Sequence, residues 1–364
     1  MPPLRGSFFV LILYDVAEEI QLSKVRGLLG AEPPRREPSF KHPAPQYVRF
    51  ERPPVVEHPG SILLPNGERF QSRVKYFDYG IVSVELELPF ETDWEDLVHL
   101  SSRWIDAPEL EKSAGELVRS RLERVAPALV QPYEARLSED YYIIHLREAP
   151  DEQGCPLGGA EMLASQGAQI ARIIRGESAA LAEAECNEAL QSRLSYYPND
   201  LIVVGWVAAL IYDSTEGATP AIELLEYANT QLLEFRHYDE VLTRVLADVY
   251  KMLEHKGGIF RHWRMARQAE RLNALRLDVT ELAERTDNAI KFLSDMFYAR
   301  AYRVAANRVG VTDYRNLVEQ KLRIAADLYT SMVNEFHQGR AFVLEAMVVA
   351  ILVIELIHLF SGKL

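Results

Sequence analysis

The sequence predicts an α+β protein: a ferredoxin-like split βαβ head, then long antiparallel helices in a bundle or coiled coil, then a C-terminal apolar helix. Three observations support this class. Strand and helix patterns alternate over residues 1–150. After residue 215 apolar residues recur every three or four positions, as on one face of a helix. The stretch 341–360 is almost continuously apolar. We therefore divide the chain into an α+β head at 1–214, a helical stalk at 215–340 and the terminal helix.

The charge and cysteine content argue against several classes of site. The 364 residues include 40 Lys and Arg against 53 Asp and Glu, and the net charge of −13 argues against broad binding to nucleic acid phosphates. Cys155 and Cys186 lie far apart, with neither C-x-x-C spacing nor neighbouring histidines, so neither zinc nor a disulfide framework is expected. We expect no metal, no other cofactor, and a reducing compartment for most of the chain.

The first apolar run, residues 7–14 (SFFVLILY), is typical of a buried strand. A signal peptide is not expected, because only Arg5 precedes the run, Asp15 follows at once and no small-residue cleavage site is present. Residues 16–29 have the apolar spacing of an amphipathic helix, which Gly30 would end.

The next segment, residues 31–59, contains eight prolines. Proline removes backbone donors and interrupts helices, so we expect an extended surface excursion inserted after the first helix. Pro65-Asn66-Gly67 then predicts a hairpin between strands at 62–64 and 69–71, because Asn-Gly accepts positive φ at low cost.

A second strand pair is expected at 73–77 and 81–88. Along the second of these strands apolar residues alternate with Ser83, Glu85 and Glu87. This alternation predicts a sheet with one face in water.

Two helices and a further strand complete the predicted head. Thr92 or Asp93 is suited to cap one helix, and Pro108 to begin another that runs to about Val125. Residues 141–146 form a strand pattern. The order β, α, β, β, α, β is that of a ferredoxin-like fold, which hosts many functions and therefore indicates none by itself.

The second long apolar run, residues 201–212 (LIVVGWVAALIY), is too short for a membrane-spanning helix and rich in β-branched residues. We expect one buried strand here, at the end of the head.

Beyond it, Thr219 and Pro220 have the residue types of a helix N-cap and first helical position. Glycines at Gly257-Gly258 and Gly310 would separate three long helices that pack as an antiparallel bundle. These helices are expected at 219–253, at 260–309 and from 312 onward.

The terminal stretch (AFVLEAMVVAILVIELIHLF) would be about 30 Å long as a helix, which matches the hydrocarbon core of a bilayer. Glu345, Glu355 and His358 interrupt it and all fall within one half of the helix. Glu355 and His358 are three apart, close enough to share a hydrogen bond. The helix therefore either spans a membrane, with protein against its polar side, or is buried in protein. In both cases we expect these three residues to act in helix pairing rather than in ion or proton conduction.

No pattern in the sequence points to catalysis. The nucleotide-binding, nucleophile-elbow, H-E-x-x-H and kinase motifs are all missing. The cluster at 237–240 (HYDE) lies within a helical pattern and is expected to be a solvated face. We therefore expect no enzyme and assign no catalytic residues.

Leu344-Glu345, Val348-Val349 and Glu355 follow a helical stretch at 318–332, and Tyr79-Gly80-Ile81-Val82 forms a strand pattern. In these features the C-terminal third resembles the required-for-meiotic-nuclear-division family, whose shared region is a domain of unknown function. The resemblance implies a non-enzymatic, membrane-anchored protein. Mitochondrial relatives associate with the inner membrane, and a bacterial cytoplasmic membrane is the setting expected for this chain.

The function expected from these features is that of a tail-anchored scaffold with its head in the cytoplasm. Its partners would be membrane lipid, other copies of itself and an unknown protein, but not nucleic acid. The first alternative is a soluble homo-oligomeric interaction module whose terminal helix is buried. The second is an enzyme that uses the sheet of the head.

Overall fold

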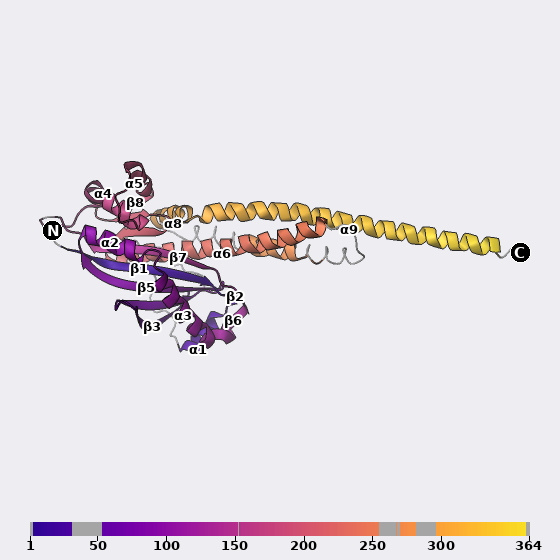
Figure 1. Ribbon diagram of the computed structural model, residues 1–364, viewed down its shortest axis with the longest axis horizontal. Helices are drawn as coiled ribbons and strands as arrows, with labels where there is room; N and C mark the ends of the chain where they lie inside the picture. The colour runs from indigo at the N-terminus through magenta and orange to yellow at the C-terminus, as the bar shows by residue number, and fades with distance from the viewer. Residues whose placement is uncertain are drawn as a thin grey trace. The chain divides into compact units, whose positions relative to one another are not determined.

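The fold is α+β, with a large mixed sheet in the N-terminal part and long helices after it (Figure 1), which confirms the predicted class. The chain forms two compact units: unit 1 comprises Met1–His237 with Thr286–Tyr314, and unit 2 comprises Tyr238–Arg285 with Arg315–Leu364. The predicted boundaries at 214 and 340 stay predictions. The computed structural model describes residues 3–30, 53–151, 153–254, 267, 270–281 and 296–361.

Unit 1 is built around an eight-stranded sheet with the order β3-β4-β5-β1-β7-β10-β9-β8. Neighbouring strands are antiparallel except β10 and β7, which are parallel. A separate small sheet pairs β2 with β6. The strands are β1 Leu4–Asp15, β2 Ala17–Ile20, β3 Val55–Leu63, β4 Arg69–Tyr76, β5 Ile81–Thr92, β6 Leu129–Pro132, β7 Ser138–Glu148, β8 Arg193–Leu194, β9 Leu201–Val204 and β10 Ala208–Tyr212.

The first apolar run forms a buried strand, β1, as predicted, and the structure places it between β5 and β7. Phe8 and Val10 lie in the main hydrophobic core on one face of the sheet. Leu11 and Leu13 alternate with such residues and are fully buried on the other face. A strand buried on both sides requires cover on both faces of the sheet.

The main hydrophobic core lies between four helices and the face of the sheet that carries Phe8 and Val10. The side chain of Asp93 accepts a hydrogen bond from the backbone N–H of Asp96 at 2.9 Å and caps α2, while Pro108 is the first residue of α3. Both predicted helix starts are confirmed. The helices are α1 Leu22–Leu29, α2 Trp94–Trp104, α3 Pro108–Val125 and α4 Gly159–Arg175, and the short elements η1 Ala126–Ala128 and α5 Glu183–Ala189 follow α3 and α4.

The single helix predicted at 16–29 is wrong. Its first part, Ala17–Ile20, is strand β2, and only Leu22–Leu29 is helical, ending at Gly30 with a φ of 64°. The partner strand β6 is distant in sequence, so local apolar spacing cannot reveal the pairing.

The hairpin predicted at Pro65-Asn66-Gly67 is confirmed as the turn between β3 and β4, with a φ of 87° at Gly67. Most of the proline-rich segment, residues 31–52, lies outside the described residues. Residues 55–59 belong to β3 rather than to a surface excursion. β3 is an edge strand, where a proline such as Pro59 is tolerated.

The single strand predicted at 201–212 is wrong, because this stretch forms the hairpin of β9 and β10. The backbone N–H of Gly205 donates to the carbonyl of Ala208 at 2.8 Å. A Cβ at position 205 would lie 2.6 Å from that same oxygen. Gly205 therefore allows the chain to turn within a stretch whose apolar composition predicted one uninterrupted strand.

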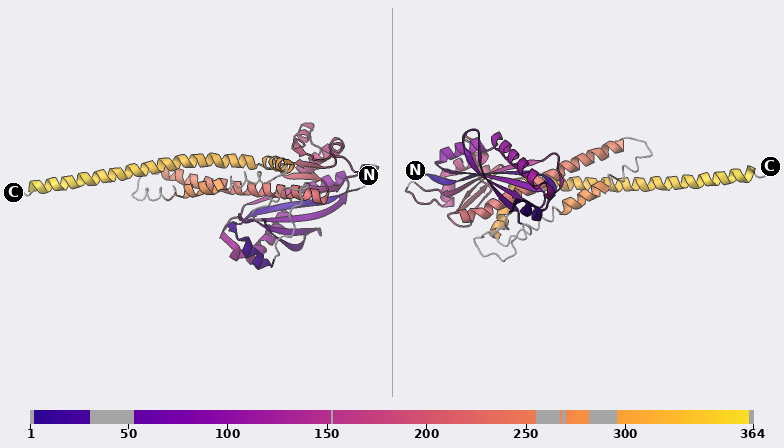
Figure 2. Two further views of the ribbon diagram at one scale, coloured as in Figure 1. Left: turned by 180° about the vertical axis from the view of Figure 1, so that it is seen from behind. Right: turned by 90° about the horizontal axis from the view of Figure 1, so that it is seen from below.

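Helix α6 is Thr215–Glu254, and its part within unit 1 covers the second face of the sheet (Figures 1 and 2). The helix begins earlier than predicted: Pro220 lies inside it, and the Ser214 hydroxyl accepts a hydrogen bond from the N–H of Gly217 at 3.2 Å. The predicted cap at Thr219 is therefore wrong. Helix α8 Met296–Arg308 also belongs to unit 1, and the ring of Tyr302 lies 5.8 Å from that of Tyr227 on α6.

Unit 2 is helical in its described parts. Lys321 of α9 Val311–Ser361 binds the side chains of Asp239 and Thr243 on α6, each at 2.5 Å. The predicted stop at Gly257-Gly258 lies outside the described residues, as do parts of the helix predicted at 260–309. The core of the unit is formed by α6, the helical residues 270–281 and α9, and contains Val245, Leu246, Val249, Leu272 and Ala325.

Candidate functional site

The C-terminal part of α9 exposes an unusual amount of apolar surface. In Figure 1 its last turns, in yellow, run on beyond the other described elements of unit 2. A helix that is apolar all round is normally buried in protein or membrane. Nine large side chains between residues 347 and 357 are 49–64% exposed: Met347, Val348, Val349, Ile351, Leu352, Val353, Ile354, Leu356 and Ile357.

The predicted site residues lie along the same segment. Glu345 and Glu355 are exposed. They are about 15 Å apart along the helix axis, so they do not contact each other. The side chain of His358 lies outside the described residues. The role of Glu345, Glu355 and His358 in helix pairing therefore stays a prediction.

The membrane anchor predicted at 341–360 is contradicted. Across the residues that the structure describes, no helix is both long and apolar enough to cross a membrane. The carboxylates of Glu345 and Glu355 interrupt the apolar run, and each opposes insertion. The predictions of a tail-anchored protein and of a bacterial or mitochondrial membrane location are therefore wrong, while the predicted partners, membrane lipid among them, stay predictions.

A second candidate site is a buried ionic network between the sheet and α6. The alternation of Ser83, Glu85 and Glu87 along β5 predicted a face in water, but Ser83 is fully buried and Glu85 is only 2% exposed. The prediction is wrong because α6 covers this face and brings Glu226 to it.

Lys75 of β4 is the centre of this network. Its Nζ atom lies 2.5 Å from Glu226 and 2.9 Å from Glu85, and Ser83 donates to the other oxygen of Glu226 at 2.6 Å. Burial alone would lower the pKa of Lys75, but the two carboxylates raise it above its ordinary value. Burial likewise opposes ionisation of Glu85, yet Lys75 and Arg73 hold its pKa below the usual range. Lys75 and Glu85 are therefore both ionised at neutral pH.

Glu223 lies one turn before Glu226 on α6. Burial raises the pKa of its carboxyl, and the charge of Lys75 opposes that shift only in part. Toward the edge of the network, Arg73 contacts both Glu85, at 3.2 Å, and Glu87, at 3.3 Å.

The start of the HYDE cluster at 237–240 is also not a solvated face. His237 Nδ1 lies 2.6 Å from Asp15 at the end of β1, and its ring stacks on Tyr133 at 4.7 Å between centroids. Burial raises the pKa of Asp15, and the bond to His237 opposes that rise. Asp239 faces Lys321 within unit 2. These contacts join distant segments, which helical spacing alone could not reveal.

Chemically, the network is a set of mutually neutralising charges that fixes α6 to the sheet. Within the described parts of the chain, no three His, Cys, Asp or Glu side chains are grouped so that they could hold a metal ion. One sequence signal could have indicated the network: Arg73 and Lys75 have the same spacing on β4 as Glu85 and Glu87 on β5. Such cross-strand pairs of opposite charge stabilise a sheet.

The fold and these sites define a two-unit α+β protein with a sheet-based N-terminal domain. Residues 5–219 match the family described as "Uncharacterized protein MJ0711, N-terminal domain", and the chain belongs to this family. Uncharacterized protein MJ0711 of Methanocaldococcus jannaschii is 23% identical over 188 residues, which cover 52% of this chain and 58% of that protein. The match thus spans less than two thirds of the relative's length. No solved structure matches the chain. The predicted membership of the required-for-meiotic-nuclear-division family is wrong, because both matches are to MJ0711-type proteins.

Proposed function

We propose that the chain is a non-enzymatic interaction module that self-associates through the C-terminal part of α9. The observation that carries this proposal is the row of nine exposed apolar side chains at 347–357. Together they expose on the order of 1,000 Å², compared with about 800 Å² that one partner contributes to a standard protein interface. Burying half of this surface would favour association by roughly 10 kcal/mol before the entropic cost of assembly.

A second copy of the chain is the partner that this surface fits. Val349, Val353 and Leu356 follow the i, i+4, i+7 spacing of a coiled-coil seam. All three are exposed in the single chain. Identical copies of such a seam can interlock side by side, because each presents the same knobs and holes.

The opposite side of the helix carries a second seam, Met347, Ile351 and Ile354, with the same spacing. The two seams are about 160° apart around the axis, as follows from about 100° per residue. Covering both requires two neighbouring helices. We therefore infer an assembly of three or more chains.

We also propose that unit 1 contains a ferredoxin-like sheet and that the long helices pair antiparallel. Strands β4, β5, β1 and β7 are neighbours in this order and antiparallel, which supports a ferredoxin-like unit enlarged by further strands at both edges. The contacts of α6 with α9 in unit 2 support antiparallel pairing of the long helices as a bundle or coiled coil.

Molar mass in solution tests the proposal. The variant Val353→Glu/Leu356→Glu places two charges in one seam, and we expect the mass, measured by light scattering on a sizing column, to fall from at least three chains to fewer. Arg323→Glu is the matched control, because it changes the charge by the same amount at an exposed position of α9. Circular dichroism should show that both variants remain helical.

Two outcomes would overturn the proposal. One is a wild-type protein that is monomeric at micromolar concentration. The other is a double variant with the same mass as the wild type.

A further inference from the structure

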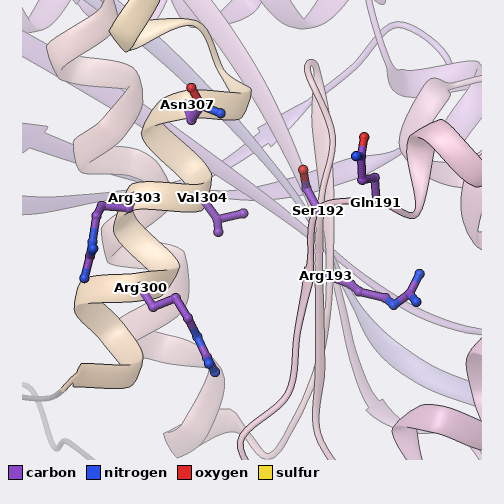
Figure 3. A pocket seen from close by; sticks show the side chains of 7 residues that line it. All are labelled: Gln191, Ser192, Arg193, Arg300, Arg303, Val304 and Asn307. Carbon is purple, nitrogen blue, oxygen red and sulfur yellow. The ribbon is translucent and has the colours of Figure 1, made fainter.

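A groove of about 360 Å³ lies on unit 1, far in sequence from the self-association segment. One wall is the chain that enters edge strand β8, with Gln191, Ser192 and Arg193. The other is a face of α8 whose residues are spaced by three, one and three positions: Arg300, Arg303, Val304 and Asn307. Figure 3 shows Val304 pointing from α8 toward the strand side.

The three arginines of the groove have no carboxylate partner among the described residues. Arg193 donates to the carbonyl of Leu190 at 3.1 Å, and Arg303 to that of Ala299 at 3.3 Å. The guanidinium of Arg300 lies 5.7 Å from the centre of the Phe297 ring. All three side chains are exposed. Their positive charges are therefore available to a ligand.

Arginines next to the groove are neutralised in the usual way. Arg308, one turn beyond Val304, binds Glu188 at 2.6 Å, and Arg175 binds Glu185 and Glu188. Acidic side chains are thus present nearby but are already in contact with other cations. The chain as a whole has a net charge of −13, whereas the groove is lined by three arginines and no acidic residue. The groove is therefore a positively charged region on a negatively charged protein.

The remaining lining residues suit oxyanions. The hydroxyl of Ser192 and the amides of Gln191 and Asn307 can donate hydrogen bonds to phosphoryl oxygens, which arginine binds through its planar fork of donors. The volume lies in the range of about 300–1,000 Å³ that is typical of small-molecule sites. In Figure 3 the three guanidinium groups lie apart: that of Arg300 points toward the strand side, that of Arg303 lies on the other side of α8, and that of Arg193 points away from α8. A ligand must therefore carry several negative groups to engage more than one of these exposed side chains.

We propose that this groove binds the polyphosphate group of a small ligand, such as a nucleoside triphosphate. Arg300 points toward the phosphoryl groups, and the exposed side chains of Arg193 and Arg303 turn into the groove to reach them, with Ser192 and Asn307 as further donors. None of the groove residues lies in the apolar segment of α9, so polyphosphate binding and self-association can be tested independently of each other.

Calorimetric titration of the full chain with inorganic tripolyphosphate, with ATP and with a short single-stranded oligonucleotide tests the proposal. We expect both small polyphosphates to bind, and Arg300→Gln/Arg303→Gln to raise their Kd at least about tenfold. Arg119→Gln, at an exposed position on α3, is the control and should leave the Kd unchanged. Circular dichroism will show whether each variant is folded, and Arg193→Gln gives an independent test from the other wall.

Comparing the three titrations also identifies which kind of phosphate compound the groove binds. Tighter binding of ATP than of tripolyphosphate supports a nucleotide ligand, and equal binding supports recognition of the polyphosphate alone. The proposal is overturned if neither small polyphosphate binds at about 1 mM, if only the oligonucleotide binds, or if Arg119→Gln weakens binding as much as the groove variants do.

Discussion

Replacing Lys75 with methionine tests whether the buried network holds α6 on the sheet. The change removes the cation that faces both Glu85 and Glu226. Glu85 keeps Arg73 at 3.2 Å, but Glu226 keeps, within the described structure, only the hydroxyl of Ser83 at 2.6 Å. A buried charge that loses its counter-charge costs about 3–5 kcal/mol of stability. We expect a loss of this size.

A second substitution, at Glu226, shows how much of the stability loss in Lys75→Met comes from the unpaired carboxylate of Glu226 and how much from the lost packing of the lysine side chain. Glu226→Leu alone leaves Lys75 with Glu85 at 2.9 Å, so its cost should be smaller than that of Lys75→Met. The double variant Lys75→Met/Glu226→Leu removes the unpaired carboxylate and should be at least about 2 kcal/mol more stable than Lys75→Met alone.

Urea unfolding followed by tryptophan fluorescence measures these differences, since Trp94 and Trp104 are buried in unit 1. Arg5→Met is the control, because the ion pairs of Arg5 are exposed, and the urea midpoint should not change. A cost of less than about 1 kcal/mol for Lys75→Met, or a double variant less stable than Lys75→Met alone, would show that the buried network does not hold α6 on the sheet.

Two other predictions concern stability. Because burial raises the pKa of Glu223 above 4.5, the stability that this group contributes is present at low pH and is lost as the pH rises through the raised pKa. Glu223→Gln should therefore raise Tm at pH 7 but not at pH 4, and calorimetric scans with equal shifts at both pH values would contradict this. Gly80→Ala would place a Cβ 1.8 Å from the carbonyl oxygen of Ala17 at a φ of 90° and should cost at least about 2 kcal/mol in urea unfolding. Gly27→Ala in α1, where a Cβ meets nothing within 4 Å, should be neutral or stabilising by up to about 1 kcal/mol, so equal losses in the two variants would refute the argument.

Features governed by neighbouring residues could be predicted from the sequence. Asp93 caps α2 because its carboxylate reaches a backbone N–H three residues on, and Pro108 begins α3 because the first turn needs no N–H there. The turn at Pro65-Asn66-Gly67 depends on the same kind of local preference. The α+β class follows from a series of such signals.

Features governed by distant residues could not be predicted in this way. Lys75 and Glu226 are 151 positions apart, and no local pattern indicates that a helix so far along the chain covers β5. The groove could not be predicted for the same reason, since Arg193 and Arg300 line one groove only because α8 packs near the edge strand β8 in the folded chain. The prediction for the terminal helix is wrong for another reason: its length matches a bilayer, but Glu345 and Glu355 interrupt the apolar run, and no described helix is both long and apolar enough to cross a membrane.

The order in which the chain fills its two units has a consequence for biosynthesis. Unit 1 takes residues up to His237 and then Thr286–Tyr314, whereas unit 2 takes the segment between them and the one after. On the ribosome, unit 1 therefore waits for residues 238–314 to be made, which takes about 4–15 s at typical rates of synthesis. Until then the ring of Tyr227 lacks the ring of Tyr302 on α8, which lies 5.8 Å from it in the folded chain. Because the chain passes between the units three times, a protease that cuts one of these connections still leaves a part of unit 1 covalently linked to a part of unit 2.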